Sequence, residues 1–191
     1  MKGRKIVVAV TGASGSIYAR QLILLLKSEK LSAQIETVAL VFSKNAIQVW
    51  NHELGLFDEN SLPFKRYELS DYTAPFASGS ARFDTMIICP CSMGTAGRIA
   101  HGISDDLIGR AADVMIKEKR KLVVVPRENP FSLIHINNLK ILAENGVIVC
   151  PATPSFYSLP LSIEDLVNTV IYRVLDLCGF ETYSYRWSEK S

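Results

Sequence analysis

The stretch Ile6-Val7-Val8-Ala9-Val10-Thr11-Gly12-Ala13-Ser14-Gly15-Ser16 decides the fold of this chain. Its first five residues are continuously apolar, which is typical of a strand buried on both faces of a sheet. The glycines that follow tolerate a positive φ and let a ligand approach the backbone closely. A helix that begins at Ser16 would offer free N–H groups and a positive dipole end to an anion. The stretch therefore predicts a phosphate-binding turn, although turns of this kind also occur without a ligand.

The spacing of these glycines does not match the motifs for dinucleotides. A Gly-x-Gly-x-x-Gly fingerprint that starts at Gly12 needs glycine at position 14, where this chain has Ser14. The Thr-Gly-x-x-x-Gly-x-Gly motif of short-chain dehydrogenases also fails, because Ser16 and Tyr18 occupy its later glycine positions. A nicotinamide-dependent reductase is disfavoured further, since the chain has no Tyr-x-x-x-Lys pair. Hydroxyl side chains in place of glycines favour a mononucleotide phosphate.

Length and composition predict one domain of an ordinary globular protein. The 191 residues are 48% hydrophobic and 21% charged, which suits a single sizeable core. The net charge of +2 is too small to indicate a nucleic acid or an anionic membrane as partner. The first apolar run is too short for a signal sequence or a membrane span, so we expect a cytoplasmic protein. The four cysteines and three histidines lack the spacing of a zinc site, and we expect no metal.

Apolar runs recur along the chain and alternate with stretches of helical pattern. The predicted strands are 6–10, 38–42, 85–89, 122–125 and 147–150. The predicted helices are 16–28, 44–54, 92–97 continuing through 105–119, 132–145 and 162–177. This alternation indicates βαβ units. We expect a three-layer αβα sandwich with a Rossmann-like (flavodoxin-like) parallel sheet, in a single domain of residues 1–179 with a tail of residues 180–191.

The residues that follow each predicted strand are polar or form rigid turns. Ligands of open α/β sheets bind beyond the carboxyl ends of the strands, so these exits are the candidate site. Hydroxyl groups at several helix starts can bind one anion without adding charge. Arg127 and Glu128, between two prolines, could simply pair with each other, but polar exits gathered at one edge favour a site. The five exits begin at Thr11, Ser43, Pro90, Pro126 and Pro151.

Six motifs in a fixed order carry a resemblance to a known family. They are Thr-Gly-Ala-Ser-Gly at 11–15, Ala-Pro-Phe-Ala-Ser-Gly-Ser at 74–80, Cys-Pro-Cys-Ser-Met-Gly-Thr at 89–95, Gly-Arg-Ala-Ala-Asp at 109–113, Val-Pro-Arg-Glu at 125–128 and the segment 151–157. Over about residues 5–187 the chain resembles the UbiX family of flavin prenyltransferases. That family belongs with the decarboxylase-like flavoproteins that bind flavin mononucleotide (FMN). Several ordered motifs are more specific than any single one.

The resemblance implies an activity and partners. Members of the family join a dimethylallyl group, supplied by a dimethylallyl phosphate, to reduced FMN without a metal. FMN is thus both cofactor and substrate, and prenylated FMN is the product. A UbiD-type decarboxylase then uses that product. Members assemble into homo-oligomers, commonly dodecamers, whose sites form between subunits. Whether the donor is the mono- or the diphosphate is left open.

The resemblance also implies roles for individual residues. FMN would be held by Gly12, Ala13, Ser14, Ser43, Ser92, Met93, Gly94, Thr95 and Arg127. The donor would be bound by Lys117, Arg110, Tyr157, Arg173 and Trp187, with its phosphate site crossing a subunit interface. The catalytic residues would be Glu128, Lys117 and Glu53. The tail that contains Trp187 would close over the active site.

These residues fit the chemistry that such a transfer needs. Ionisation of an allylic phosphate leaves a delocalised cation and a departing phosphate, so cationic clamps and aromatic surfaces are required. Lys117, Arg173 and Tyr157 supply the clamp, and the flavin with Tyr157 or Trp187 could supply the aromatic surface. Glu128 could accept the proton that ring closure releases. Two other function classes remain open. They are an FMN-dependent oxidative decarboxylase of cysteine-like substrates, and a non-enzymatic flavin carrier or accessory subunit of an aromatic-acid decarboxylase.

Overall fold

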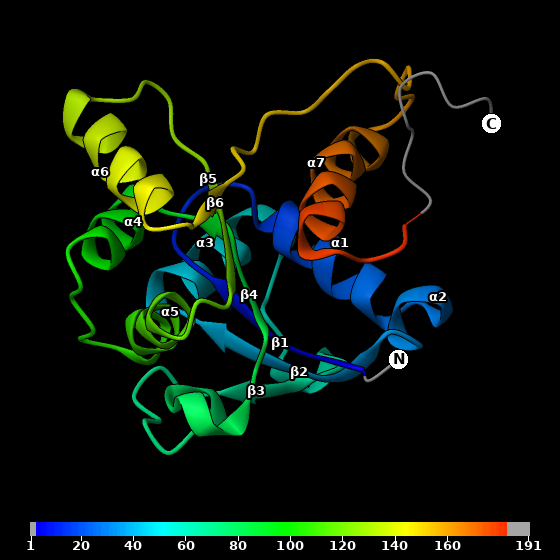
Figure 1. Cartoon of the computed structure of the whole chain (residues 1–191). Coiled ribbons are helices and arrows are strands. Elements are labelled where there is room, and N and C mark those ends of the chain that lie inside the picture. Colours follow the sequence, from blue (N-terminus) through cyan, green and yellow to red (C-terminus); the bar gives the residue numbers. More distant parts are fainter. Residues whose placement is uncertain (1–2, 183–191) are drawn as a thin grey trace.

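A six-stranded parallel sheet forms the centre of the molecule (Figure 1). The structure, a computed structural model, describes residues 3–182 of the chain. The strand order is β3-β2-β1-β4-β5-β6, the 3-2-1-4-5-6 order of a Rossmann-like sheet. The connections diverge between β1 and β4, where such sheets bind ligands. The strands are β1 (Arg4–Val10), β2 (Ile35–Phe42), β3 (Lys65–Tyr67), β4 (Thr85–Cys91), β5 (Lys121–Pro126) and β6 (Ile148–Val149).

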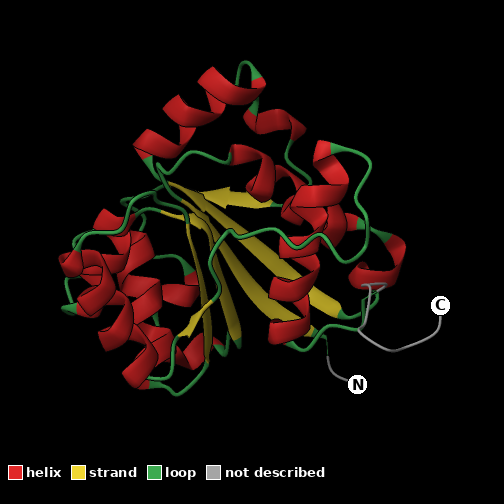
Figure 2. Cartoon of the chain, turned by 90° about the horizontal axis from the view of Figure 1, so that it is seen from above, coloured by secondary structure: helices red, strands yellow, loops and turns green. Residues whose placement is uncertain are grey.

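Helices cover both faces of the sheet, as the view from above shows (Figure 2). One face packs against α1, α3 and α7, and the other packs against α4, α5 and α6. This arrangement confirms the predicted three-layer αβα sandwich. The helices are α1 (Ser16–Lys27), α2 (Glu29–Ser32), α3 (Lys44–Leu54), α4 (Met93–Ala100), α5 (Leu107–Lys117), α6 (Leu133–Glu144) and α7 (Ile163–Cys178).

The first strand shows why its sequence is continuously apolar. Ile6, Val8 and Val10 point into the core under α1 and α7. Val7 and Ala9 point into the core under α4 and α5. All five side chains are at most 1% exposed. Because side chains alternate between the two faces, a strand that is covered on both faces must be apolar at every position.

Two features of the fold differ from the sequence prediction. The edge strand β3 was not predicted, because its three residues, Lys65 to Tyr67, are polar or only partly buried and lack an apolar pattern. The helix predicted to continue from 92–97 through 105–119 is two helices. Gly102 between them has a φ of 68°, and the Asp106 side chain accepts a hydrogen bond from the Gly109 N–H at 2.7 Å. A left-handed glycine and a new N-cap end one helix and start the next.

The described part of the predicted tail, residues 180–182, lies at the amino-terminal edge of the sheet. Gly179 ends α7 with a φ of 81°, and Phe180 is buried in the core. The backbone N–H of Glu181 donates to the Gln34 side chain at 3.0 Å, and that side chain donates back to the Glu181 carbonyl at 3.2 Å. Trp187 lies outside the described residues. Closure of the tail over the site stays a prediction.

Among residues 3–182, no helix combines the length and the apolar character needed to cross a membrane. No group of three or more His, Cys, Asp and Glu side chains gathers as metal ligands would in this part of the chain.

Candidate functional site

The carboxyl ends of β1, β2 and β4 are joined by hydrogen bonds into one edge. The Thr11 hydroxyl donates to the Pro90 carbonyl at 2.8 Å and accepts from the Ser92 N–H at 2.7 Å. On the other side of β1, the Ser43 N–H donates to the Val10 carbonyl at 3.0 Å. Three of the polar exits predicted from the sequence therefore form a single surface. Sequence reasoning gave Thr11 no such role, although a threonine where a buried strand ends is the signal that could have shown it.

Two helices begin at this edge and direct their first N–H groups toward it. The Ser43 side chain accepts from the Ala46 N–H at 3.1 Å, and the Ser92 side chain accepts from the Thr95 N–H at 3.3 Å. The other N–H groups in the first turns of α3 and α4 have no partner within their helix. A Cβ atom at Gly94 would meet no atom within 4 Å, so space is open beside the start of α4. The two positive dipole ends and this space suit the phosphate of a mononucleotide.

The glycine turn after β1 packs closely against α3. A Cβ atom at Gly12 would overlap the Cβ atom of Asn45, so only glycine fits there without movement. Gly15 adopts a φ of 108°, which side chains rarely allow. Two other predicted FMN contacts lie nearby: Ala13 in the turn and Met93, the first residue of α4. Both side chains are buried. The turn thus places backbone, rather than bulky side chains, at the edge.

The start of α1 already carries an anion, which comes from the protein itself. The Glu53 carboxylate accepts hydrogen bonds from the N–H groups of Gly15, at 3.0 Å, and Ser16, at 2.7 Å. Burial alone would raise the pKa of Glu53, but hydrogen bonds from the Ser14 side chain and from Gly15 and Ser16 outweigh it and lower the pKa. The expectation that the start of α1 would offer free N–H groups to phosphate is therefore wrong for these two groups. The starts of α3 and α4 remain available.

Arg127 brings an uncompensated positive charge to the same edge. Its side chain is exposed and forms no ion pair with Glu128 or with any other residue of the described chain. The Glu128 carboxylate instead accepts from the Asn129 N–H at 3.1 Å. Arg127 also acts on the Tyr18 phenol in α1, whose pKa is raised by burial and by Cys89 and lowered in part by Arg127. The alternative that Arg127 and Glu128 satisfy each other is not seen.

Two of the predicted donor-binding cations lie on α5. The Arg110 guanidinium donates to the Ala77 carbonyl and pairs with Asp113, both at 3.0 Å. The Lys117 ammonium, in the last turn of α5, lies 3.5 Å from the Glu118 carboxylate. The Arg110 side chain is 36% exposed and the Lys117 side chain 49%, so both can reach a ligand or another molecule.

Within one chain, Lys117 does not meet the predicted FMN residues. Shortly after α5, Lys121 pairs with Thr85 where β5 and β4 start, which places the end of α5 at the amino-terminal edge. Arg127 follows the last residue of β5, at the other edge. The six residues of β5 span about 20 Å. Lys117 and Arg127 therefore lie at opposite edges of the sheet.

Arg173 and Tyr157 flank the exit of β6. Arg173 was expected on an apolar face of its helix, but its side chain is exposed while Val170 and Val174 beside it are buried. It lies near the Cys150 thiol, whose pKa burial raises and Arg173 partly lowers. Tyr157, which is 69% exposed, belongs to the loop between β6 and α7. Both side chains can therefore reach a ligand at this edge.

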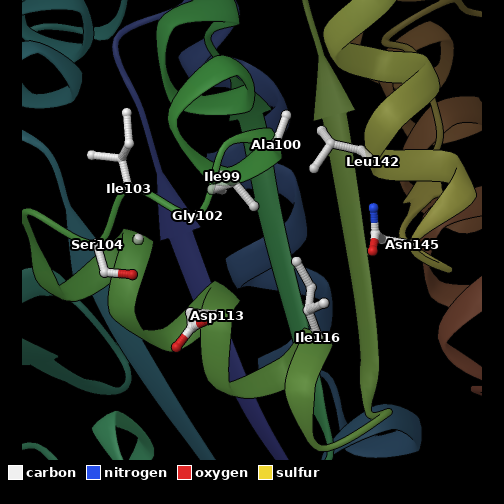
Figure 3. A pocket seen from close by; sticks show the side chains of 10 residues that line it. Ile99, Ala100, Gly102, Ile103, Ser104, Asp113, Ile116, Leu142 and Asn145 are labelled. Atoms are coloured by element: carbon white, nitrogen blue, oxygen red, sulfur yellow. The ribbon is translucent and has the colours of Figure 1, made fainter.

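A small pocket of about 160 Å³ lies elsewhere, among α4, α5 and α6 (Figure 3). Its lining includes the large apolar side chains of Ile99, Ile103, Ile116 and Leu142. Small-molecule sites usually measure about 300–1,000 Å³. The pocket is therefore too small to hold a flavin.

Known flavoproteins are similar to this chain, which agrees with a mononucleotide site at the edge of the sheet. A family model described as Flavoprotein matches residues 1–175. The flavin prenyltransferase UbiX of Thermoplasma acidophilum is 47% identical over 180 residues, which cover 92% of this chain and 94% of that protein. The chain belongs to the UbiX family of flavin prenyltransferases.

Two solved structures of UbiX proteins share the fold over the full chain. The crystal structure of AnUbiX (PadA1) in complex with FMN and dimethylallyl pyrophosphate is 39% identical, with a TM-score of 0.91 and complete coverage of both chains. A dodecameric FMN-dependent UbiX-like decarboxylase from Escherichia coli O157:H7 is also 39% identical, with a TM-score of 0.88 and coverage of 97% of this chain and 100% of that one. The resemblance to the UbiX family that the motifs indicated is confirmed.

Proposed function

We propose that this UbiX-family protein transfers a dimethylallyl group from a dimethylallyl phosphate to reduced FMN and releases prenylated FMN. The observation that carries the proposal is the edge at which the starts of α3 and α4 meet the uncompensated charge of Arg127. A UbiX relative of the same fold binds FMN and dimethylallyl pyrophosphate. An oxidative decarboxylase of cysteine-like substrates is not favoured, because the relatives that match most of the chain are named flavin prenyltransferases.

The residues at the edge fit FMN. The Ser43 and Ser92 caps, the first N–H groups of α3 and α4, and Arg127 would hold its phosphate, while the turn at Gly12 and the space beside Gly94 would admit the flavin. Reduced FMN supplies the nucleophilic ring nitrogen and the ring carbon that accept the prenyl group. Glu128, whose carboxylate is exposed beside Arg127, would accept the proton that ring closure releases.

The phosphate of the donor should bind where the protein supplies positively charged side chains. A departing phosphate needs cations that hold it more tightly as its charge develops. Arg173 and Tyr157 can supply part of this clamp at the exit of β6. Glu53, held as a carboxylate by the start of α1, would place a fixed negative charge close to the reacting centre. These roles follow from the family resemblance and from the positions of the side chains.

The opposite positions of Lys117 and Arg127 make a second copy part of the site. A donor bound by Lys117 could not reach the strand exits of the same chain across about 20 Å. Contact becomes possible when α5 of one copy lies against the strand exits of another. The UbiX-like relative from Escherichia coli O157:H7 is a dodecamer. We therefore assign Lys117 and Arg110 to the neighbouring copy, with a dodecamer as the expected assembly.

Mass spectrometry of the flavin tests the proposed reaction. The purified protein is incubated anaerobically with reduced FMN and with either dimethylallyl phosphate or dimethylallyl diphosphate. A gain of one five-carbon unit on the flavin supports the transferase, and the two donors show which phosphate is used. Bound but unchanged flavin with both donors would instead support a carrier. Addition of a UbiD-type apo-decarboxylase to the product tests the expected partner, which should gain activity.

Mixed oligomers test whether the site is shared. Lys117→Gln and Glu128→Gln should each be inactive alone, and reassembly of an equal mixture should restore about a quarter of the wild-type activity, because one site in four would receive both intact residues. The matched control mixes Lys117→Gln with the double variant Lys117→Gln/Glu128→Gln, which should restore nothing. No recovery in the first mixture would place both residues in one copy.

A further inference from the structure

A larger cavity, of about 580 Å³, lies at the amino-terminal edge of the sheet, opposite the proposed flavin site. Arg4 pairs with Ile35, and Thr85 pairs with Lys121, so the starts of β1, β2, β4 and β5 meet here. The end of α7 closes one side, where the Arg4 guanidinium donates to the Gly179 carbonyl. The volume falls within the range of about 300–1,000 Å³ that small-molecule sites occupy. The cavity is lined by segments 3–5, 33–36, 82–85 and 179–181 and by Lys121.

Two of the three acidic side chains in this lining already have partners within the chain. The Glu36 carboxylate lies 3.1 Å from the Lys5 ammonium. The Asp84 carboxylate accepts hydrogen bonds from the Lys5 N–H at 2.8 Å and from the Thr85 hydroxyl at 2.7 Å. Glu181 is the remaining acid, and its side chain is exposed. The lining therefore offers few free acceptors.

The cations of the lining are less well compensated. The side chains of Arg82 and Lys121 form no hydrogen bond or ion pair with any residue from 3 to 182. The Arg4 guanidinium donates to the Gly179 carbonyl at 2.6 Å and lies over the Phe180 ring, which leaves its other nitrogens as donors. Three cations thus line the cavity with unused hydrogen-bond donors.

The helix dipole of α7 explains part of this charge but not all of it. Arg4 and Lys121 lie beside the carboxyl end of α7, where cations are favourable. Arg82 belongs to a different segment, and its backbone has a φ of 55°, which residues other than glycine adopt rarely. This conformation ends the 3₁₀ helix Gly79–Ala81, but neither that role nor the dipole of α7 accounts for the unpaired guanidinium of Arg82.

We propose that this cavity is a second ligand site, which binds a small molecule bearing a phosphate group. Guanidinium groups match the oxygens of a phosphate in pairs. With Lys5 and Glu36 paired, the cations Arg4, Arg82 and Lys121 outnumber the acids Asp84 and Glu181 in the lining, so its remaining charge is positive. The ligand is either inorganic phosphate or an organic phosphate ester, which share this chemistry. We expect binding here to be separate from prenyl transfer, because the cavity lies at the opposite edge from the flavin turns of its own chain and neither Lys117 nor Arg110 lines it.

Hydrogen exchange measured by mass spectrometry tests the site in the full-length protein saturated with FMN. Inorganic phosphate, adenosine monophosphate and dimethylallyl phosphate are added in turn at matched ionic strength. We expect slower exchange in peptides that cover 79–86 and 176–182. Equal protection by inorganic phosphate and the esters would identify the phosphate alone as the ligand. Stronger protection by an ester would show that the cavity also holds the organic part.

In the variant Arg82→Gln/Lys121→Gln, the ligand concentration needed for half of the protection should rise by at least about tenfold, while prenyl transfer continues. Arg82→Gly removes the charge and suits the left-handed backbone, so it serves as a second variant that should fold. The matched control, Lys65→Gln/Lys140→Gln, removes two exposed cations outside the cavity and should leave protection within about twofold. Three results would overturn the proposal: sodium chloride gives the same protection as phosphate, none of the three probes slows exchange, or both Arg82 variants keep the full protection. Because the readout is exchange at this edge, failure here is distinguishable from failure of prenyl transfer.

Discussion

The Glu53 carboxylate, at the end of α3, lies 2.7 Å from the backbone nitrogen of Ser16, at the start of α1. The two residues are 37 positions apart in the sequence. The carboxylate therefore supplies the negative charge that the N-terminus of α1 favours, and it ties two helices together beside the flavin edge.

Glu53 should stabilise the fold through this contact. We expect Glu53→Ala to lower the free energy of unfolding by about 1 kcal/mol, as the loss of a cap does, and Glu53→Gln to lower it less because the amide oxygen still accepts. Urea denaturation at constant protein concentration measures the change. Glu144→Ala, which removes an exposed acid in α6, is the control. An equal loss in both variants would argue against the cap.

The same contact should make stability depend on pH. Because the folded state lowers the pKa of Glu53 below its ordinary value of 4.5, its contribution is complete above that value and is lost as the pH falls through the lowered pKa. The difference in unfolding free energy between the wild type and Glu53→Gln should therefore be largest near neutral pH and shrink in acid. A difference that grows on acidification would contradict the lowered pKa.

Two glycines at the flavin edge should separate folding from ligand binding. Gly12→Ala should destabilise the protein by about 1–3 kcal/mol, because the new Cβ atom overlaps Asn45 and α3 must move. Gly94→Ala meets open space in α4 and should keep or slightly raise stability, yet weaken FMN binding. Thermal unfolding and flavin fluorescence titration measure the two effects. Unchanged FMN affinity in Gly94→Ala would mean that the flavin does not bind beside the start of α4.

Glu128 should be needed for turnover but not for binding. The variant Glu128→Gln keeps the size of the side chain and removes the base, so we expect FMN to be retained while prenyl transfer stalls. Flavin content after purification and mass analysis of the flavin report the two properties. Glu144→Gln serves as the control for loss of an exposed acid. Full activity in Glu128→Gln would remove this residue from the mechanism.

The four cysteines should differ in reactivity because their surroundings differ. Burial raises the pKa of Cys91 and of Cys178 to about 12, and it also raises the pKa of Cys89. Cys150 is only partly buried, and Arg173 opposes the rise of its pKa. Native alkylation at pH 8 should therefore modify Cys150 first, and Arg173→Gln should slow it. Labelling in urea gives the fully reactive reference. If the alkylation rate of Cys150 were the same in Arg173→Gln as in the wild type, Arg173 would not influence the pKa of this thiol.

The sequence predicted the fold well where a local pattern carries the information. The apolar run from Ile6 to Val10 reveals a strand covered on both faces, because no other environment requires every residue to be apolar. The same reasoning missed β3, since a short edge strand owes its existence to pairing with β2 rather than to its own residues. Composition cannot show such pairing.

The sequence predicted that the strand exits lie together, but it did not predict the contacts between them. Ser43 and Ser92 follow buried strands, and the rule for strand exits placed them together. The contact of Glu53 with the start of α1 depends on how α3 packs, which no local pattern specifies. Likewise, the distance between Lys117 and Arg127 follows from the direction of α5 in the folded chain.

The opposite locations of Lys117 and Arg127 give the chain a head and a tail. A contact that joins the head of one copy to the tail of the next uses two different surfaces, and such contacts propagate until the rotation between copies closes a ring. Every copy in a closed ring is both donor and recipient of a binding surface. A ring therefore holds as many complete sites as copies, whereas an open chain of copies always leaves one half-site unmatched at each end.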